Sequence, residues 1–473
     1  MCTFKKIQII KIFKGQFLYK IDATKKKALH IQLYEEIKKD IVQNYQTGNK
    51  LPSIRKLSAE YKLSKTTVES AYSQLYAEGF IDSKPKSGYF VTDLLYDEVK
   101  KVIKTAQKET QQKKYRYDFF PAELKKEDFP LKIWKRLSNK VLDSELEFGS
   151  YGEGQGELGL RAEIASYLNS LRGVKCTSEQ VIICSGFSDA MGLLAKLIKK
   201  KYTHFGMEEP GYHVARRVFE EYGYIMKNIK VDAQGMSLKS LKNSKAKLIY
   251  ITPSHHYPTG ATMSVSRRLK FLEYINTKDG LIIEDDYDSE LAYYNRPIPS
   301  LQGLDTNDVV VYMGTFAKSL SPALRVSYMI LPHHLLPLYK QSYDAHFPRV
   351  SITTQKTLEL FMKEGHWERH LRKIRTLNKK KHNYLKELLH KKLKNSFKIV
   401  AEGAGLAILI NPISPRFDLE KLKNLAEDAG IKLYFAKERS GGEFEAIRMG
   451  FGGFLLEELE EAVDAFAEVW HQV

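Results

Sequence analysis

Apolar residues recur at helical spacing in the first part of the chain. Four of them are separated by four positions each, namely Leu29, Leu33, Ile37 and Ile41. Residues at this spacing lie on one face of an α-helix, and Gly48 interrupts the pattern. The pattern predicts an amphipathic helix over residues 29–41.

Two shorter helices are predicted after it, each with a serine N-cap. Ser53 precedes a helical stretch that runs to Tyr61. Ser64 caps the next helix, whose inner face carries Val68, Ala71, Tyr72 and Leu75. Gly79 stands at the C-cap position, where glycine readily ends a helix. Only Lys62-Leu63 separates the two helices, so a tight turn connects them.

A β-hairpin is predicted next. Phe80-Ile81 and Gly88–Val91 have strand character, and the turn from Lys84 to Gly88 contains Pro85. The order is therefore helix, helix, helix and hairpin.

From about Tyr117 the pattern changes to short apolar runs that alternate with helix-like stretches. The apolar runs are residues 180–184, 247–252, 280–284 and 309–313, and the helical stretches include 189–199 and 266–276. Strands that alternate with helices are typical of an α/β domain with a mainly parallel sheet.

These patterns divide the chain into four segments. Residues 1–20 are a basic extension, and residues 21–92 form the domain of helices and hairpin. Residues 93–116 are polar and rich in lysine, and they are expected to form a linker. Residues 117–473 form the α/β domain.

Charge indicates a class of partner. The net charge is +18, from 75 Lys and Arg against 57 Asp and Glu, and residues 1–116 contain 24 of these bases and 12 of the acids. A surplus concentrated in the first quarter of the chain favours a polyanionic partner, most simply nucleic acid. Charge alone leaves open a solvated basic face or a disordered tail.

The composition favours a soluble, cytoplasmic protein. No apolar run approaches the ~18–20 residues of a membrane helix, and the N-terminus lacks the apolar core of a signal peptide. Cys2, Cys176 and Cys184 form no paired framework, which fits a reducing compartment. Neither a membrane nor a metal is expected as a partner.

The first domain is predicted to be a winged helix-turn-helix, whose second helix lies in the major groove of DNA. That helix begins with small and cationic side chains, which suit base edges and phosphates. Taken singly, each residue is more simply explained by capping or solvation, but the set favours DNA. The residues expected at duplex DNA are Ser53, Arg55, Ser64, Lys65, Thr66, Thr67, Lys84, Lys86 and Gly88.

The segment LPSIRKLSAEYKLSKTTVESAYSQLYAEGFIDSKPKSGYFV resembles the winged helix-turn-helix of GntR-type bacterial regulators. The resemblance extends from Ala28 to about Thr92, and the spacing of the LPS, AEG and GYFV positions agrees throughout. It implies a double-stranded DNA operator as partner.

Lys318 is the first candidate for covalent chemistry in the α/β domain. It lies in YMGTFAKSLSPALRVSYMILP, directly after an apolar strand, and Arg325 follows seven positions later. This setting suits a Schiff-base lysine beside a phosphate, because desolvation and a nearby cation would lower the pKa of the lysine. The alternative is an ordinary surface lysine.

Strand ends supply further candidates. In LIIEDDYDSE, Asp285 can hold a protonated pyridine nitrogen and Tyr287 a ring hydroxyl, although Asp285 is equally well explained as a strand-end cap. In CSGFSDAMGLL, Gly186, Phe187 and Ser188 lead into a helix whose N-terminus can bind phosphate.

Two more residues are candidates for ligand contacts. Tyr212 in EEPGYHVARR either stacks on a ring or packs in the core. Arg448 lies in the apolar strand of EAIRMGFGGF, where a cation needs a partner and a ligand carboxylate would provide one.

From about Asp118 to the C-terminus these motifs resemble the fold-type I aminotransferases, with YGEGQGELGLRAEIASYL as the usual opening. Together with the winged helix, they resemble the MocR/GabR family of transcription regulators. The resemblance implies a pyridoxal-phosphate-dependent transferase fold, which has a mixed, mostly parallel sheet and a small C-terminal subdomain. It further implies pyridoxal 5'-phosphate as cofactor and a homodimer.

The same resemblance gives each candidate a role. Lys318 is the lysine of the internal aldimine, Asp285 is the partner of the pyridine nitrogen, and Arg448 anchors the carboxylate of the effector. The resemblance assigns the phosphate to Arg325, Thr315, Gly186, Phe187 and Ser188. Tyr212 and Tyr287 are the candidates for contacts with the ring.

Departures from the family pattern bear on the effector. Tyr257 stands where aminotransferases carry the asparagine of Asn-Pro-Thr-Gly. The turn after EEPGY reads His213-Val214 in place of two arginines, so a second cation for a ligand carboxylate would have to be Arg216 or Arg439.

The expected function is a regulator that senses an amine, an amino acid or pyridoxal phosphate itself. Two alternatives stay open. One is a catalytically active aminotransferase with an appended DNA-binding module, which turnover of several amino donors would reveal. The other is a DNA-binding protein whose large domain binds no cofactor.

Overall fold

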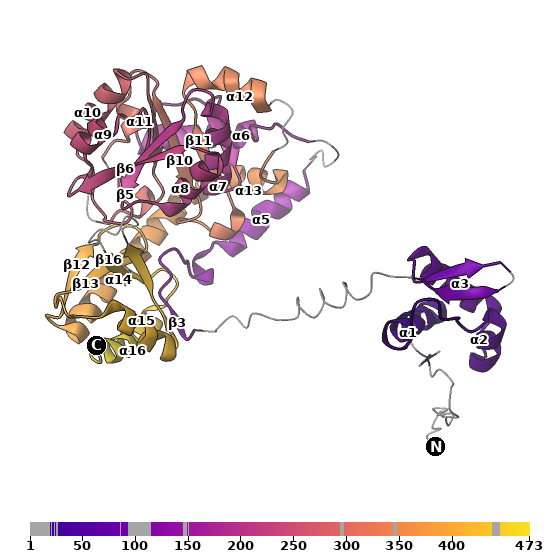
Figure 1. The fold of residues 1–473 in the computed structure, drawn as a ribbon. Coiled ribbons are helices and arrows are strands. Elements are labelled where there is room, and N and C mark those ends of the chain that lie inside the picture. The colour runs from indigo at the N-terminus through magenta and orange to yellow at the C-terminus, as the bar shows by residue number, and fades with distance from the viewer. Residues whose placement is uncertain are drawn as a thin grey trace. The chain divides into compact units, whose positions relative to one another are not determined.

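The structure is a computed structural model, and its described residues form two units that divide between Lys113 and Lys114 (Figure 1). The described residues are 19, 21–22, 24, 27–85, 87–92, 115–144, 149, 151–293, 298–343, 348–437 and 445–473. The predicted extension, except Tyr19, most of the predicted linker, Lys86 and Arg439 lie outside them. Within the described residues, no helix is both long enough and apolar enough to cross a membrane.

The first unit consists of three helices and a hairpin, in the predicted order. Its elements are α1 (Leu29–Asn44), α2 (Ile54–Tyr61), α3 (Lys65–Ala77), β1 (Ile81–Lys84) and β2 (Gly88–Val91). Both serine caps are confirmed: the Ser53 hydroxyl accepts from the Lys56 amide at 3.2 Å, and the Ser64 hydroxyl accepts from the Thr67 amide at 3.1 Å. Gly79 has the left-handed φ of 76° that ends α3.

The core of the first unit contains the predicted inner face of α3. Val68, Ala71, Tyr72 and Leu75 are fully buried against Leu33 and Ile37 of α1 and Leu57 of α2. Tyr19 also belongs to this core, because its ring stacks on Tyr61 at 5.5 Å and its hydroxyl donates to Asp40 at 3.1 Å. The packed domain therefore includes a residue of the expected extension.

An eight-stranded sheet forms the centre of the second unit. In spatial order its strands are β4 (Val181–Cys184), β11 (Ser327–Ile330), β10 (Val310–Thr315), β9 (Leu281–Asp285), β8 (Leu248–Ile251), β5 (His204–Glu209), β6 (Ile225–Asp232) and β7 (Gly235–Met236). The strands from β10 to β6 run parallel, and β11 and β7 are antiparallel to their neighbours. The expected mixed, mostly parallel sheet is confirmed, and the four predicted apolar runs are β4, β8, β9 and β10.

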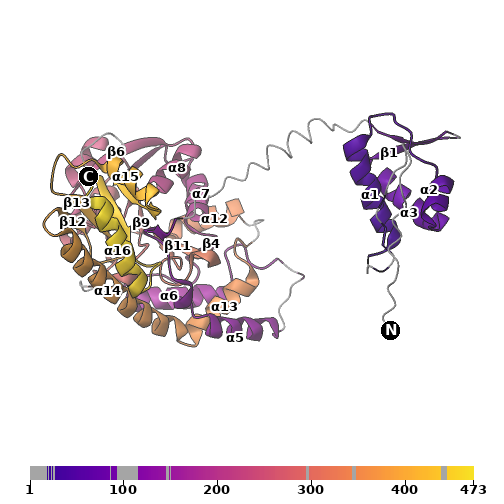
Figure 2. The ribbon, with the colours of Figure 1, turned by 90° about the horizontal axis from the view of Figure 1, so that it is seen from below.

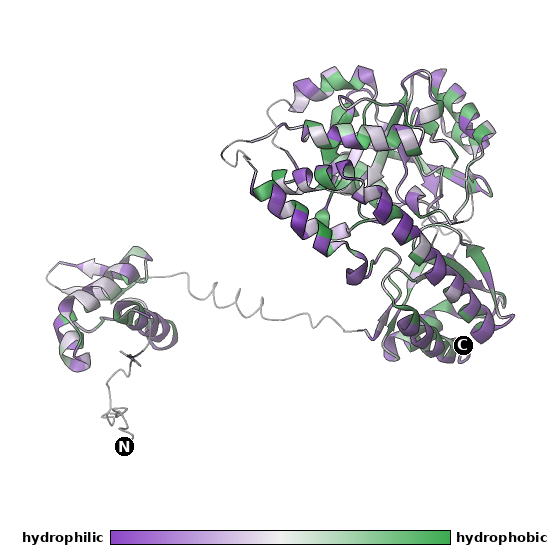
Figure 3. Cartoon of the chain, turned by 180° about the vertical axis from the view of Figure 1, so that it is seen from behind, coloured by the Kyte–Doolittle hydropathy of each residue, from purple (hydrophilic) through white to green (hydrophobic). Residues whose placement is uncertain are grey.

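Helices cover both faces of this sheet (Figures 1 and 3). One face packs on α7 (Phe187–Ile198), α8 (His213–Glu221) and α12 (Leu336–Tyr343). The other packs on α6 (Leu158–Leu171), α9 (Leu238–Ser244), α10 (Val265–Asn276), α11 (Leu301–Leu304) and α13 (Ile352–Lys363). Neighbouring strand residues face opposite sides, since Ile182 lies in the first cluster and Ile183 in the second. The helical stretches predicted at 189–199 and 266–276 are α7 and α10.

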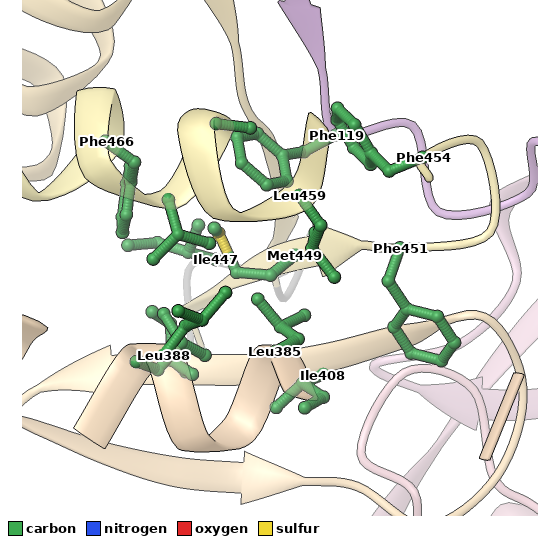
Figure 4. Packing of buried hydrophobic residues seen from close by; sticks show 14 of the residues in the cluster. Phe119, Leu385, Leu388, Ile408, Ile447, Met449, Phe451, Phe454, Leu459 and Phe466 are labelled. Atoms are coloured by element: carbon green, nitrogen blue, oxygen red, sulfur yellow. The ribbon is translucent and has the colours of Figure 1, made fainter. Parts of the chain in front are cut away.

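A four-stranded antiparallel sheet forms a small C-terminal subdomain, as expected. Its strands are β12 (Phe397–Ala401), β13 (Ala407–Pro412), β16 (Glu445–Gly450) and β15 (Tyr434–Lys437). The helices beside it are α14 (His366–Leu393), α15 (Leu419–Asp428) and α16 (Leu456–Trp470). Figure 4 shows Leu385 and Leu388 of α14 packed toward Ile447 and Met449 of β16. Figure 2 shows α14 and α16 side by side along this subdomain.

The start of the second unit is attached to the small subdomain. β3 (Tyr117–Asp118) pairs in parallel with β14 (Ile431–Lys432), and Phe119 is fully buried between α16 and the loop at Phe454 (Figure 4). The chain then passes through α5 (Leu131–Leu142) into the large sheet. Short 3₁₀ turns lie at Lys126–Asp128, Ser289–Leu291, Pro322–Leu324 and His333–Leu335.

Candidate functional site

The first turn of α3 exposes the side chains that the sequence assigns to DNA. Lys65 and Thr66 are exposed, as is Arg55 on α2. The hydroxyl of Ser64 lies 2.9 Å from that of Thr66 and 2.8 Å from that of Thr67, so this turn presents a cluster of hydroxyl groups beside a cation. Such a surface suits phosphate and base-edge contacts.

The hairpin carries cations close to one aromatic ring. The ammonium groups of Lys84 and Lys50 lie 4.8 and 5.8 Å from the centre of the Phe90 ring. Gly88 has a φ of 111°, and a Cβ there would lie 3.3 Å from Cε of Lys50. Lys50 lies directly before the LPS motif and was not predicted as a DNA contact from the sequence.

A cleft of about 640 Å³ lies in the second unit. It opens at the carboxyl ends of β8, β9 and β10 and is closed on another side by β13 and β16 of the small subdomain. The predicted ligand residues that line it are Gly186, Phe187, Ser188, Tyr212, Asp285, Tyr287, Thr315, Lys318, Arg325 and Arg448. Side chains from six separate segments of the sequence therefore meet in one place.

One end of the cleft suits a phosphate. Gly186 has a φ of 86° and directly precedes α7, and a Cβ at this position would lie 2.2 Å from Nη2 of Arg325. The same nitrogen donates to the Ser185 carbonyl at 3.5 Å. The Thr315 hydroxyl accepts from the Ala317 amide at 3.1 Å. A guanidinium beside the N-terminus of a 12-residue helix concentrates positive potential there.

Lys318 lies in the turn that follows β10 and reaches the cleft. Burial lowers the pKa of its amine to about 8, and the positive charge of Arg448 adds to this effect. Asp288 and Asp285 oppose it because a nearby carboxylate stabilises the ammonium form. The side chain is therefore a more available nucleophile than an exposed lysine.

Asp285 is the last residue of β9 and pairs with Met313 of β10. Its carboxylate accepts a hydrogen bond from the Tyr250 hydroxyl at 2.5 Å. Burial raises the pKa of Asp285 to about 7, and the carboxylates of Asp286 and Asp288 contribute to the rise. A cation placed beside this carboxylate would favour its charged form.

Aromatic rings form one wall of the cleft. Tyr212, at the start of α8, makes edge-to-face contacts with Phe187 at 5.2 Å and with Tyr257 at 5.3 Å. Burial raises the pKa of the Tyr212 hydroxyl to about 12. The wall therefore suits a flat ring.

Arg448 faces the cleft from β16 of the small subdomain. Its Nη1 donates to the Tyr257 hydroxyl at 2.7 Å, and its guanidinium carbon lies 4.7 Å from the centre of the Tyr257 ring. Its Nε is buried and has no hydrogen-bond partner in the described part of the chain. The guanidinium therefore keeps a donor for an acceptor supplied by a ligand.

Arg216 does not line the cleft. Its guanidinium is buried in α8 and donates to Glu209 at 3.0 Å and to Asn228 at 2.7 Å. This pairing compensates its charge within the large domain, so the geometry gives no support to an effector contact from Arg216.

Several cleft residues were not identified from the sequence. They include residues 120–124, Tyr250, His255, Asp288, Ser327 and several residues between 401 and 409. His255 and Asp288 follow the ends of β8 and β9, so a histidine and an acid after strand ends were the available signal. Tyr250 lies within an apolar strand, and nothing in the strand pattern distinguishes it from a core tyrosine.

Two family models match the chain. The model described as "Bacterial regulatory proteins, gntR family" matches residues 29–91, and the model "Aminotransferase class I and II" matches residues 120–466. The two matches coincide with the two units of the fold.

Curated bacterial regulators match from 76% to 94% of the chain. An HTH-type transcriptional regulator of Bacillus subtilis, YdeL, is 35% identical over 94% of this chain and 98% of its own length. The probable rhizopine catabolism regulatory protein MocR of Rhizobium meliloti is 32% identical over 85% of both chains. The pyridoxine biosynthesis transcriptional regulator PdxR of Corynebacterium glutamicum is 27% identical over 76% of this chain and 78% of its own.

Solved aminotransferases share the fold of the second unit. The α-aminoadipate aminotransferase LysN of Thermus thermophilus covers 75% of this chain and 92% of its own, with a TM-score of 0.66 and 21% identity. A multiple substrate aminotransferase of Thermococcus profundus covers 79% of this chain and 94% of its own, with a TM-score of 0.67 and 22% identity.

Proposed function

Because this chain belongs to the MocR-type family of bacterial regulators, in which a GntR-type domain precedes an aminotransferase class I and II domain, we propose that it is a pyridoxal-phosphate-dependent transcription regulator. Its cleft would hold the cofactor and an amine or amino acid as effector. Its winged helix-turn-helix would bind a double-stranded DNA operator.

The fit of the cleft to pyridoxal phosphate supports the cofactor. The glycine at residue 186 leaves room for the Arg325 guanidinium beside the N-terminus of α7, which suits a phosphate dianion. Asp285 is a buried acceptor for a pyridinium N–H, and Tyr212 offers an aromatic face to a ring. Pyridoxal phosphate, when bound, supplies an aldehyde that condenses reversibly with primary amines.

The residues of the chain divide the work of sensing. With a pKa of about 8, roughly one Lys318 amine in ten is unprotonated at pH 7, which makes the amine available as a nucleophile. Asp285 would hold the ring nitrogen in its protonated form. Arg448, with its unused Nε donor, would bind the effector carboxylate across the cleft.

One observation carries the proposal: Lys318, Asp285 and the Arg325–Gly186 contact line a single cleft in a chain that also carries a GntR-type domain. An aminotransferase needs the lysine, the aspartate and the contact that suits a phosphate, whereas a regulator also needs the DNA-binding domain. Their combination therefore favours sensing coupled to DNA binding over catalysis alone.

We expect the regulator to be a cytoplasmic homodimer. Large apolar side chains are exposed on and after α5, at Leu131, Leu142, Tyr151 and Leu158. Large apolar side chains that are exposed to solvent are candidates for a subunit interface. A dimer would present two winged helices to a pair of half-sites.

The test is a titration of the cofactor-loaded full chain with amines and amino acids, followed by visible absorbance, together with operator binding before and after addition. A spectral change accompanied by altered operator affinity supports the regulator. Sustained turnover to keto acids with several donors would instead favour the aminotransferase. A chain that takes up no cofactor would favour a DNA-binding protein with an inactive large domain.

A further inference from the structure

His255 and Asp288 form a largely buried pair in the wall of the cleft, and the aminotransferase-like chemistry described above does not use them. Nδ1 of His255 lies 2.8 Å from Oδ2 of Asp288, and the two side chains are 17% and 5% exposed. They come from the loop after β8 and the segment after β9, which are 33 positions apart.

The pair contacts Tyr287, one of the residues proposed to bind the cofactor. The Tyr287 hydroxyl donates to the His255 carbonyl at 3.2 Å, and it lies 3.4 Å from Nδ1 of the same residue. The two rings lie nearly parallel, with centres 6.2 Å apart. The orientation of the tyrosine therefore depends on where His255 is held.

Glycines leave the space that the pair occupies. A Cβ at Gly405, whose φ is 69°, would lie 2.7 Å from Oδ2 of Asp288 and 3.7 Å from Cε1 of His255. A Cβ at Gly260, whose φ is 72°, would lie 3.5 Å from Nε2 of His255. Gly405 enters from the loop between β12 and β13, and its amide donates to the Leu291 carbonyl at 3.1 Å. The pair is thus seated where the large and small subdomains meet.

The charges around the pair connect it to Lys318. Burial opposes protonation of His255, but Asp288 raises the pKa of the imidazole above its ordinary value. Among the charged neighbours of Lys318, Asp288 has the largest influence on the pKa of its amine. The charged or titratable groups that surround His255 are Asp288, Asp285, Tyr287, Lys318, Arg448, His256, Tyr257, Arg172 and Glu402.

We propose that His255 and Asp288 are a positioning pair: His255 supports the Tyr287 hydroxyl and holds the Asp288 carboxylate beside Lys318 with its charge partly neutralised. The inference rests on the proposed function, since it concerns the lysine and the tyrosine that would meet the cofactor. Neither residue of the pair needs to touch the cofactor in this role.

The first test measures covalent uptake of pyridoxal phosphate by the full chain as a function of pH, with borohydride trapping and mass spectrometry of the intact chain. His255→Gln removes the imidazole that lies 2.8 Å from the Asp288 carboxylate, which leaves more of the carboxylate charge to act on Lys318, so the midpoint of the pH profile should rise by about one unit. Asp288→Asn removes the negative charge, so the midpoint should fall by about one unit. A purely structural role would not move the two variants in opposite directions.

The matched controls use features of the same chain. His333→Gln disrupts a surface pair with Asp308, whose nitrogen and oxygen lie 3.4 Å apart, and it should leave the midpoint unchanged. Gly405→Ala should move the midpoint because its Cβ displaces Asp288. Gly365 has the same φ of 69°, and only one atom lies within 4 Å of a Cβ added there. Gly365→Ala should therefore leave the midpoint unchanged. These glycine variants decide the question if His255→Gln or Asp288→Asn does not fold.

A double-mutant cycle tests whether His255 supports the Tyr287 hydroxyl. Tyr287→Phe should weaken retention of pyridoxal phosphate in the wild-type chain and have a clearly smaller effect in His255→Gln, because coupled residues are not additive. The proposed role of the pair would be contradicted by any of three results: unchanged midpoints, midpoints that move in the same direction, or full additivity in the cycle. None of these results would contradict the proposed function. Failure of the wild-type chain to take up the cofactor at any pH would overturn the proposed function, and the pair with it.

Discussion

The Arg325 guanidinium occupies the space that a side chain at residue 186 would need. An ideal Cβ on Gly186 would lie 2.2 Å from Nη2 and 2.7 Å from Cζ of Arg325. Gly186 and Arg325 are 139 positions apart in the sequence, but the guanidinium can take this position only if residue 186 has no side chain.

Gly186→Ala is therefore expected to abolish tight binding of pyridoxal phosphate, because the arginine must leave the helix N-terminus. The backbone at residue 186, with a φ of 86° and a ψ of 173°, is a conformation that essentially only glycine adopts, so alanine adds a cost of about 1–3 kcal/mol to folding. Gly173→Ala is the matched control, since its φ is 63° and nothing lies within 4 Å of its Cβ. Gly173→Ala should lower the thermal stability of the chain and leave its affinity for the cofactor unchanged. Equal cofactor affinity in both variants would remove Arg325 from the phosphate site.

Lys318→Ala should separate sensing from DNA binding. The variant loses the amine that is proposed to attach the cofactor, whereas the residues proposed to contact DNA lie in the other unit. We expect unchanged operator affinity but no response to effector, which is a loss of a coupling of about 1–3 kcal/mol. Operator affinity and promoter output with and without effector measure this. A variant that still responds fully would show that sensing does not pass through Lys318.

Arg448→Ala should weaken binding of the effector and leave binding of the cofactor unchanged. Loss of a charge-assisted hydrogen bond costs about 1.5–3 kcal/mol, and this corresponds to a fall in effector affinity of roughly 10- to 100-fold. Tyr257→Phe is the matched variant, because it removes only the hydroxyl that accepts from Arg448 at 2.7 Å. Its effect should be smaller. A spectral response of Arg448→Ala equal to that of wild type would assign the carboxylate to another cation.

Lys65→Ala should weaken operator binding by about 1–3 kcal/mol if the side chain reads a base, and should flatten the salt dependence if it contacts only phosphate. Lys39→Ala, an exposed lysine on α1, provides the control. Affinities measured over a series of salt concentrations distinguish the two contacts. If affinity and salt slope both match those of Lys39→Ala, Lys65 lies outside the interface.

The pH dependence of cofactor uptake follows from the environment of Lys318. Burial lowers the pKa of the amine to about 8, and only the unprotonated amine attacks an aldehyde. The rate of covalent uptake should therefore rise with pH and reach half of its maximum near pH 8. Stopped-flow absorbance measures it. A midpoint near the ordinary value for lysine would mean that Lys318 is solvated before the cofactor enters.

The sequence predicted residues that share a motif better than contacts between motifs. Lys318, Asp285 and Arg325 were identifiable because each lies at a strand end or turn with a recognisable local pattern. The bond between Tyr250 and Asp285 and the bond between Arg448 and Tyr257 join residues 35 and 191 positions apart. The first contact depends on the pairing of β8 with β9 in the large sheet, and the second depends on how the small subdomain packs on the large one.

Arg216 illustrates a different limit. The sequence places two adjacent arginines near the cleft, but it does not fix the rotation of the helix that carries them. In α8, Val218 and Phe219 pack toward the large sheet, and Arg216 is turned inward to Glu209 while Arg217 is exposed. The phase of one short helix thus decides which charged residues are available to a ligand.

The location of Lys318 and Arg448 on different sheets has a consequence for ligand size. Lys318 follows a strand of the eight-stranded sheet, and Arg448 lies within the four-stranded sheet. A ligand that engages both must span the distance between them with its amino and carboxylate groups. We expect a homologous series of ω-amino acids, in which only the number of methylene groups between the amine and the carboxylate changes, to tilt one sheet against the other by different amounts. Discrimination would then depend on molecular length, even among ligands with identical end groups.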